Sequence, residues 1–241
     1  VNDPSSDKTT YKIDIHTSDM DNAGTDANVH VVVFGDKGDT GKLLMDTSAD
    51  NFQRASKDTF SKTAVKNVGK ISHIVVGHDE ANLGPSWHVQ QIAVFNLATG
   101  ETVTFNADCW VAKDKAPHYS SEVTLSPAGA DPIKQCQYQV TVRTSDVRWA
   151  GTDATVSCRI VGDKGKTGMK ELENGDFDRN SEDVFTFRSI DVGTITGFEI
   201  GHGGGGAGSD WHLSNVKVAN IDRPEANPVF FFHDDWCKED V

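Results

Sequence analysis

The residues Thr17-Ser18-Asp19 and Gly24-Thr25-Asp26-Ala27 recur in the second half of the chain as Thr144-Ser145-Asp146 and Gly151-Thr152-Asp153-Ala154. Other pairs follow in the same order: Gly35-Asp36-Lys37-Gly38 with Gly162-Asp163-Lys164-Gly165, Phe52-x-Arg54 with Phe177-x-Arg179, Asp58-x-Phe60 with Asp183-x-Phe185, Gly77-His78 with Gly201-His202, Trp87-His88 with Trp211-His212, and Trp110 with Trp236. The spacing between these pairs shifts slightly along the chain, as loop insertions between fixed strands produce. The sequence therefore predicts a duplicated domain.

Composition narrows the class of protein. The 241 residues include 23 Lys and Arg against 36 Asp and Glu, a net charge of −13. The acidic excess is present in both halves, and neither half offers the basic surface that nucleic-acid binding requires. No stretch approaches the roughly 18–20 consecutive apolar residues of a membrane-spanning helix.

Period-2 patterns dominate the chain. Residues 11–17 alternate apolar with polar side chains, and residues 138–144 repeat the pattern with the same parity. This alternation is typical of half-buried strands, and no segment shows the periodicity of an amphipathic helix. We expect an all-β chain with two tandem antiparallel β-sandwiches, over residues 8–114 and 134–241. Residues 115–133 include three prolines and little apolar patterning, which predicts a linker.

These motifs, taken in order, resemble the PLAT domain, the lipoxygenase-homology module also found in polycystins and in clostridial alpha-toxin. The elements that carry the resemblance are the opening Tyr-x-Ile/Val strand, the Gly-Thr-Asp-Ala loop, the Gly-x-x-Gly-x-Thr-Gly turn, Phe-x-Arg, Gly-His-Asp and the closing Trp. The resemblance implies eight-stranded sandwiches of two four-stranded sheets. It also implies binding to membranes or partner proteins, often with calcium, while catalysis resides in other domains.

The resemblance implies calcium ligands in the loops of the first copy. Calcium prefers six to eight oxygen ligands from carboxylates, amides and backbone carbonyls. One implied position uses Asn22, Gly24, Asp79 and Glu80; a second uses Thr25, Asp26, Asp50 and Asn51; a third uses Asp46, Ala49 and Asn51. An isolated loop aspartate usually caps a turn, so the expectation depends on the convergence of the whole set.

The second copy departs from this pattern. Trp149 replaces Asn22 and Gly203 replaces Asp79, so the first position loses its side-chain ligands. The second position is retained as Thr152, Asp153 and Asp176, with a backbone carbonyl from Asn174 or its neighbour Gly175. We therefore expect the first copy to bind calcium more tightly, or to bind more ions.

Three tryptophans are candidate contacts with a membrane or partner. Trp149 lies in a loop on the metal side, where an indole has little core to enter. Trp87 and Trp211 begin a strand, and their shared parity also favours a place in the core. The family often has an apolar residue after the first of these, where this chain has His88 and His212, which weighs against lipid insertion.

The four cysteines are compatible with disulfides in an oxidising compartment or with buried thiols. The resemblance places the first and last strands of a repeat close together, which favours Cys136–Cys237, while Cys158 falls within a strand and is equally compatible with a thiol. The polar start of the chain resembles a mature end left by signal-peptide removal, so we expect a secreted protein.

Catalytic patterns are weak. His202-Gly203-Gly204-Gly205 resembles the oxyanion loop of esterases, but the chain has no Gly-x-Ser-x-Gly nucleophile motif. We expect a non-enzymatic protein that binds Ca²⁺, uses no small-molecule cofactor, and attaches to membrane lipid. The alternative is an extracellular structural or adhesion protein in which calcium rigidifies loops that bind a protein or glycan.

Overall fold

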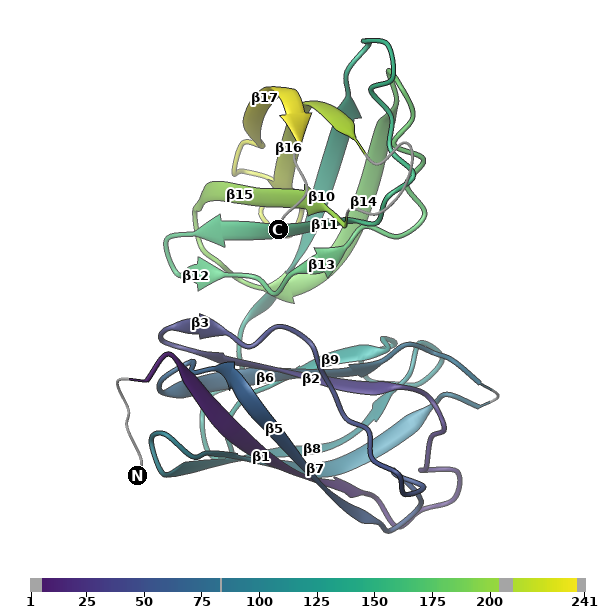
Figure 1. The fold of residues 1–241 in the computed structure, drawn as a ribbon, viewed down its shortest axis with the longest axis vertical. Coiled ribbons are helices and arrows are strands. Elements are labelled where there is room, and N and C mark those ends of the chain that lie inside the picture. The colour runs from purple at the N-terminus through teal and green to yellow at the C-terminus, as the bar shows by residue number, and fades with distance from the viewer. Residues whose placement is uncertain (1–5, 83, 204–209, 238–241) are drawn as a thin grey trace. The chain divides into compact units, whose positions relative to one another are not determined.

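The computed structural model describes residues 6–82, 84–203 and 210–237, and within these ranges all regular secondary structure is β-strand. The chain divides into two compact units, Val1–Ile133 and Lys134–Val241 (Figure 1). Every pairing among the described strands is antiparallel, which confirms the predicted all-β fold of two tandem sandwiches. No helix in the described part of the chain is long and apolar enough to cross a membrane.

The first unit consists of two sheets packed face to face. One has the strand order β5-β1-β7-β8, and the other has the order β3-β2-β6-β9 with β4 also pairing β2. Their bounds are β1 Lys8–Thr17, β2 Val29–Gly35, β3 Gly38–Asp39, β4 Leu43–Leu44, β5 Lys57–Lys66, β6 Ile71–His78, β7 Trp87–Asn96, β8 Glu101–Val111 and β9 Glu122–Leu125. The core lies between the sheets, where the apolar residues of the alternating strands meet.

The second unit repeats this arrangement. One sheet has the order β14-β10-β16-β17, and the other has β12-β11-β13 with β15 pairing β11. Their bounds are β10 Gln135–Thr144, β11 Val156–Gly162, β12 Gly165–Lys166, β13 Lys170–Glu171, β14 Glu182–Ile190, β15 Ile195–His202, β16 Trp211–Asn220 and β17 Val229–Cys237.

The repeated glycine that ends β2 and β11 has a steric cause. A Cβ atom on Gly35 would lie 2.3 Å from the carbonyl oxygen of Val68, and one on Gly162 would lie 2.2 Å from that of Val192. No other residue fits this close approach of two backbones. The next residue then stabilises the turn, since the Asp36 carboxylate accepts a hydrogen bond from Lys70 N at 3.0 Å.

The segment 115–133, expected to be a linker, differs from that expectation. Within it, residues 122–125 form β9, which pairs with β6 through Val76 opposite Val123 and Ile74 opposite Leu125. Val123 and Leu125 are buried in the core of the first unit. The alternation is only four residues long and stands between prolines, so the sequence pattern was too short to reveal a strand.

The predicted Cys136–Cys237 disulfide is absent and the prediction is wrong. Cys237 pairs with Trp211 at the start of β16, whereas Cys136 Sγ accepts a hydrogen bond from Asn220 at the end of the same strand. β16 has ten residues, so the two cysteines lie about 30 Å apart at roughly 3.3 Å per residue. A disulfide needs Cα atoms within about 7 Å. Strands β10 and β17 flank β16, but the start of one and the end of the other lie at opposite ends of the sheet.

Candidate metal centre

Three loops of the first unit meet at one end of the sandwich: 18–28 between β1 and β2, 45–56 between β4 and β5, and the described residues 79–82 and 84–86 between β6 and β7. Thr25 joins the first loop to the other two, because its N–H donates to Phe52 O at 3.2 Å and its hydroxyl donates to Pro85 O at 3.0 Å. Asn82 Nδ2 donates to the carbonyl oxygen of Asp26 at 2.7 Å. The loops are therefore held together by their own hydrogen bonds.

A small cleft of about 170 Å³ opens between the first two of these loops. Its walls include every predicted ligand of the second and third calcium positions: Thr25, Asp26, Asp46, Ala49, Asp50 and Asn51. The carboxylates of Asp26, Asp46 and Asp50 are exposed to solvent. The structure thus brings together residues that are up to 26 positions apart in the sequence.

The amide of Asn51 is fixed in the wall of this cleft. Its Oδ1 accepts hydrogen bonds from Thr47 N at 3.1 Å and Thr47 Oγ1 at 2.9 Å, and its Nδ2 donates to Asp58 at 3.2 Å. Asp58 also accepts hydrogen bonds from Phe52 N at 2.9 Å and Ser56 Oγ at 2.7 Å. Sequence reasoning did not assign a role to Asp58, although its recurrence as Asp183 was a usable signal.

The first predicted position, formed by Asn22, Gly24, Asp79 and Glu80, does not line the cleft. The Asp79 carboxylate accepts hydrogen bonds from Asn28 N at 3.0 Å, Asn28 Nδ2 at 2.5 Å and Ala81 N at 3.0 Å. Partial burial acts to raise the pKa of Asp79, but these hydrogen bonds outweigh it and hold the pKa below its ordinary value. Glu80 forms an ion pair with Lys113. Both acidic side chains of this position are therefore engaged with protein groups.

The donor chemistry of the cleft fits calcium. Carboxylate, amide and carbonyl oxygens are hard ligands, and the lining residues include no cysteine or histidine. In the described ranges, no three His, Cys, Asp or Glu side chains come close enough together to hold a metal by themselves. A bound Ca²⁺ would therefore be held by at most two of these carboxylates, Asp26 with Asp50 at the second position or Asp46 at the third, together with Asn51, backbone carbonyls and water.

The second unit has part of the same arrangement. Thr152 N donates to Phe177 O at 3.2 Å, as Thr25 does to Phe52, and Asp176 N donates to the Asp183 carboxylate at 3.0 Å. Asp153, Asn174 and Asp176 are exposed in these loops. The second unit thus retains the hydrogen bonds that hold the loops, although the ligands of the first calcium position are replaced.

The three candidate tryptophans divide into two kinds. Trp87 and Trp211 are fully buried, and their Nε1 atoms donate to Thr17 and Thr144, both at 3.0 Å. This corrects their assignment as membrane or partner contacts, because neither indole reaches the surface. Their strand parity was the signal for the core.

Trp149 is 75% exposed at the tip of the loop between β10 and β11. Its backbone has φ of 67°, a left-handed conformation that its counterpart Asn22 shares at 60°. Such a conformation is rare for a bulky residue and concentrates at functional positions. The Arg148 guanidinium lies 4.9 Å from the centre of the indole ring, within the range of a cation–π contact.

The histidines that follow the buried tryptophans are not evidence against contact with a lipid surface. His88 is buried, its Nδ1 lies 2.7 Å from Ser18 Oγ, and its ring contacts the edge of Trp110. His212 repeats this arrangement with Ser145 at 2.8 Å and with Trp236. These histidines join the loop to β8 in the first unit and to β17 in the second, so their polarity has a structural cause.

Known proteins resemble the chain over one or both units. Human lipoxygenase homology domain-containing protein 1 is 32% identical over 216 residues, which is 88% of this chain and 10% of that protein. The allene oxide synthase-lipoxygenase protein of Plexaura homomalla is 37% identical over 115 residues, 44% of this chain and 10% of that protein. Human polycystin-1-like protein 3 is 31% identical over 114 residues, 47% of this chain and 6% of that protein. The chain thus spans a tenth or less of the length of these relatives.

Among solved structures, a coral 8R-lipoxygenase aligns with a TM-score of 0.45 and 24% identity, over 51% of this chain and 18% of that one. The family model of the PLAT/LH2 domain matches residues 11–126 and 138–241, one match in each unit. The chain therefore belongs to the PLAT/LH2 domain family.

Proposed function

We propose that this chain is a non-catalytic, calcium-binding module that attaches to membrane lipid through its loops. The observation that carries the proposal is the cleft of the first unit, where two loops bring carboxylate, amide and carbonyl groups together and hydrogen bonds tie them to a third loop. When bound there, Ca²⁺ supplies positive charge that a lipid phosphate can coordinate. Asp26, Asp46 and Asp50 remain exposed enough to share an ion with such a ligand.

Trp149 supports contact with a lipid surface. A mostly exposed indole at a loop tip gains free energy by entering the interfacial region of a bilayer, and the adjacent Arg148 attracts anionic headgroups. Burial of such a side chain contributes about 2 kcal/mol. That corresponds to roughly a 30-fold change in partitioning.

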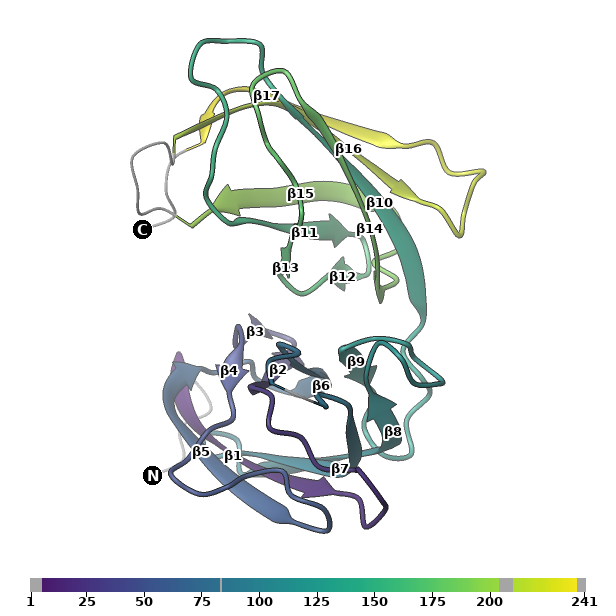
Figure 2. The same ribbon diagram turned by 90° about the vertical axis from the view of Figure 1, so that its right-hand side faces the viewer.

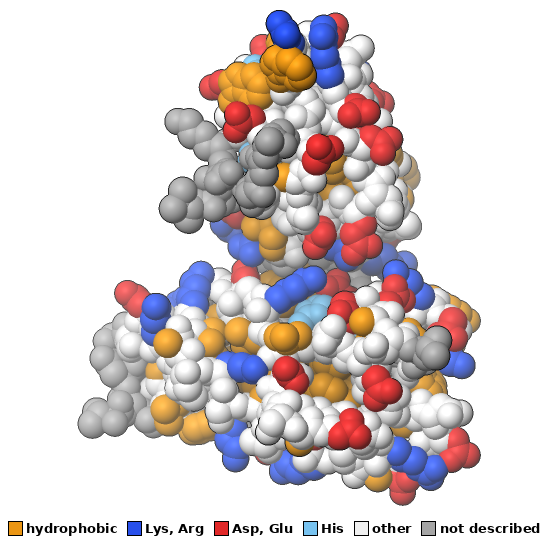
Figure 3. Space-filling view, turned by 45° about the vertical axis from the view of Figure 1, so that its right-hand side comes forward, with side chains coloured by type: hydrophobic (Ala, Val, Ile, Leu, Met, Phe, Trp, Pro, Cys, Tyr) orange, Lys and Arg blue, Asp and Glu red, His pale blue; other side chains and the backbone are white. Residues whose placement is uncertain are grey.

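The charge of the chain makes calcium dependence an expected part of this function. Acidic and basic side chains are interspersed over the faces seen in Figure 3, but the net charge is −13. Such a surface repels anionic lipid unless bound cations change its local sign. We therefore expect attachment with calcium and little attachment with a chelator.

Liposome co-sedimentation tests the proposal. The full chain is mixed with vesicles of phosphatidylcholine and phosphatidylserine, in calcium and then in chelator. We expect sedimentation only in calcium, and a loss of at least 10-fold in Trp149→Ala. Phe232→Ala is the matched control, because Phe232 is an exposed aromatic (79%) on strand β17 instead of a loop; it should sediment like the wild type.

Retained calcium binding without sedimentation on any vesicle would overturn the lipid proposal. It would favour the alternative, in which calcium rigidifies the loops for a protein or glycan partner. We also propose an extracellular location, where calcium modules work with weak sites of Kd about 10⁻⁴–10⁻³ M. Secretion of the natural protein into culture medium is the direct measurement.

A further inference from the structure

The loop between β13 and β14 contains Asn174-Gly175, the one Asn-Gly pair in the sequence. Figure 2 shows this loop at the same end of the second unit as the loop between β10 and β11. A hydrogen bond joins the two loops, since Thr152 N donates to Phe177 O at 3.2 Å. The pair therefore lies at the end of the second unit that corresponds to the calcium cleft of the first.

Asn174 and Gly175 carry two groups that react with each other in such a pair, a side-chain amide and a backbone N–H. The Asn174 side chain is exposed, and among the described residues neither its amide nor the Gly175 N–H has a hydrogen-bond partner. Asn180 in the same loop differs, because its Oδ1 accepts a hydrogen bond from Arg143 Nη2 at 3.0 Å and Ser181 follows it. The amide of Asn174 is thus free to rotate toward the next backbone nitrogen.

The fold requires glycine at position 175. A Cβ atom there would lie 2.6 Å from ring atoms of Phe177 and 2.7 Å from the ring of Phe185. Glycine has no side chain that shields its own nitrogen or restricts the backbone beside it. Asn174 has φ of 64°, a left-handed conformation in which asparagine is enriched. The shape of the loop therefore favours the residue pair whose backbone nitrogen reaches the side-chain carbon most readily.

We propose that Asn174 converts without an enzyme to aspartate or isoaspartate, which gives this loop another carboxylate. The Gly175 nitrogen loses its proton to hydroxide and attacks Asn174 Cγ. The bond from Cγ to the side-chain nitrogen breaks, and that nitrogen takes a proton from water and leaves as ammonia. Water then opens one of the two carbonyl–nitrogen bonds of the five-membered succinimide. One amide becomes one carboxylate, and no atom is oxidised or reduced.

The new carboxylate would stand where the second unit has lost an acid. Counted back from the Phe-x-Arg motif, Gly175 takes the place of Asp50, and Asn174 takes the place of Ala49, which lines the cleft of the first unit. Calcium affinity rises with the number of charged oxygen ligands. Conversion should therefore strengthen calcium binding by the second unit at least threefold. This consequence rests on the calcium binding proposed above, whereas the conversion itself does not.

Peptide mapping by mass spectrometry on the full chain tests the conversion. The protein is warmed at pH 8 and at pH 6, with the peptide of Asn180 as the internal control. We expect Asn174 to convert at least 10-fold faster than Asn180, and at least 10-fold faster at pH 8 than at pH 6, because hydroxide removes the Gly175 proton. Asn174→Gln should stay unconverted, since its longer side chain must close a six-membered ring.

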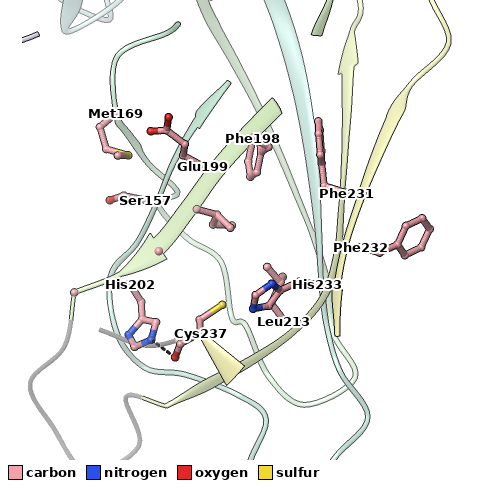
Figure 4. Close-up of a pocket in the computed structure, with 13 residues that line it drawn as sticks. Ser157, Met169, Phe198, Glu199, His202, Leu213, Phe231, Phe232, His233 and Cys237 are labelled. Carbon is pink, nitrogen blue, oxygen red and sulfur yellow. Dashed lines mark hydrogen bonds between the residues drawn. The ribbon is translucent and has the colours of Figure 1, made fainter. Parts of the chain in front are cut away.

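The measurement is made on peptides because other side chains change mass in the same incubation. Met169 and Cys237, which line the pocket shown in Figure 4, gain oxygen when oxidised. Oxidation of these residues alters the mass of the intact chain, whereas a peptide that contains Asn174 without them reports the conversion alone.

Calorimetry measures the effect on calcium in a chain whose first unit carries Asp26→Asn and Asp50→Asn. We expect the warmed protein and the variant Asn174→Asp to bind calcium at least threefold more tightly than the fresh protein. Asn180→Asp adds the same charge to the same loop and should leave the affinity unchanged.

Two results would overturn the proposal. Asn174 that converts no faster than Asn180 would remove the modification site. Conversion without a change in calcium affinity would remove the role of the new carboxylate. A wild-type chain that converts at Asn174 but binds no calcium in any form would instead contradict the proposed function and leave the conversion established.

Discussion

The side chain of Asp58 holds the wall of the cleft of the first unit in place. Its carboxylate accepts hydrogen bonds from Asn51 Nδ2, Phe52 N and Ser56 Oγ, at 3.2, 2.9 and 2.7 Å. Two of these partners belong to the wall of the cleft, and Phe52 continues into the core against Trp87. Asp58, which was not predicted as a calcium ligand, thus positions the predicted ligand Asn51.

Replacement of Asp58 by alanine tests this positioning role. Hydrogen bonds to a charged group contribute about 1.5–3 kcal/mol each when buried, and this site is half exposed. We expect Asp58→Ala to lower the free energy of unfolding by about 2 kcal/mol and to weaken calcium binding at least 10-fold. Asp183→Ala is the control, since it removes the same acceptor from the second unit; calcium binding that is unchanged in Asp58→Ala would contradict the role.

His73 is a buried base whose protonation opposes folding. It stacks on Phe34 at 4.3 Å, and burial lowers its pKa to about 4, although Asp39 acts in the opposite direction. An unfolded imidazole takes up a proton near pH 6.5. Between these two pKa values the unfolded state binds more protons, so stability falls as pH drops.

His73→Phe should remove this part of the pH dependence while keeping the ring stack. Between pH 7 and pH 5 we expect the wild type to lose about 2 kcal/mol more than the variant. Urea denaturation at both pH values measures the difference. Parallel pH profiles for the two proteins would show that His73 does not titrate with folding.

At the scale of elements, features set by local sequence pattern could be predicted from the sequence, whereas features set by which strands are neighbours could not. The strands were predictable because alternating burial produces an alternation of apolar and polar side chains in consecutive residues, as in 11–17. β9 and the separation of Cys136 from Cys237 were not, because both depend on which strand lies next to which. The members of the cleft followed from a family resemblance, while the burial of Trp87 and the role of Asp58 follow from contacts across the sandwich.

β9 should contribute measurably to the first unit. Burial of Val123 and Leu125 stabilises by about 1.5–3 kcal/mol per side chain. We therefore expect a fragment of residues 6–114 to have a free energy of unfolding lower by about 3 kcal/mol than one of residues 6–133. Chemical denaturation compares them, and equal midpoints would show that the segment 115–133 acts only as a linker.

At the scale of the whole molecule, duplication retained the scaffold and let the two loop ends diverge. Both units keep the buried tryptophan, the threonine that accepts its hydrogen bond and the aspartate beneath the loop. The first unit keeps the acidic cleft, whereas the second has an exposed Trp149 in place of Asn22. Two linked modules with different loop ends favour avidity over one strong contact.

Calcium titration by calorimetry on the full chain tests the central claim most directly. The variants are Asp26→Asn with Asp50→Asn in the first unit, and Asp153→Asn with Asp176→Asn in the second. Asp131→Asn, an exposed acid outside the loops, is the control for the charge change. We predict that the first pair removes the tighter binding event, while the second pair and the control leave it intact. A wild-type chain that binds no calcium, or a first-unit variant that binds it as the wild type does, would contradict the account.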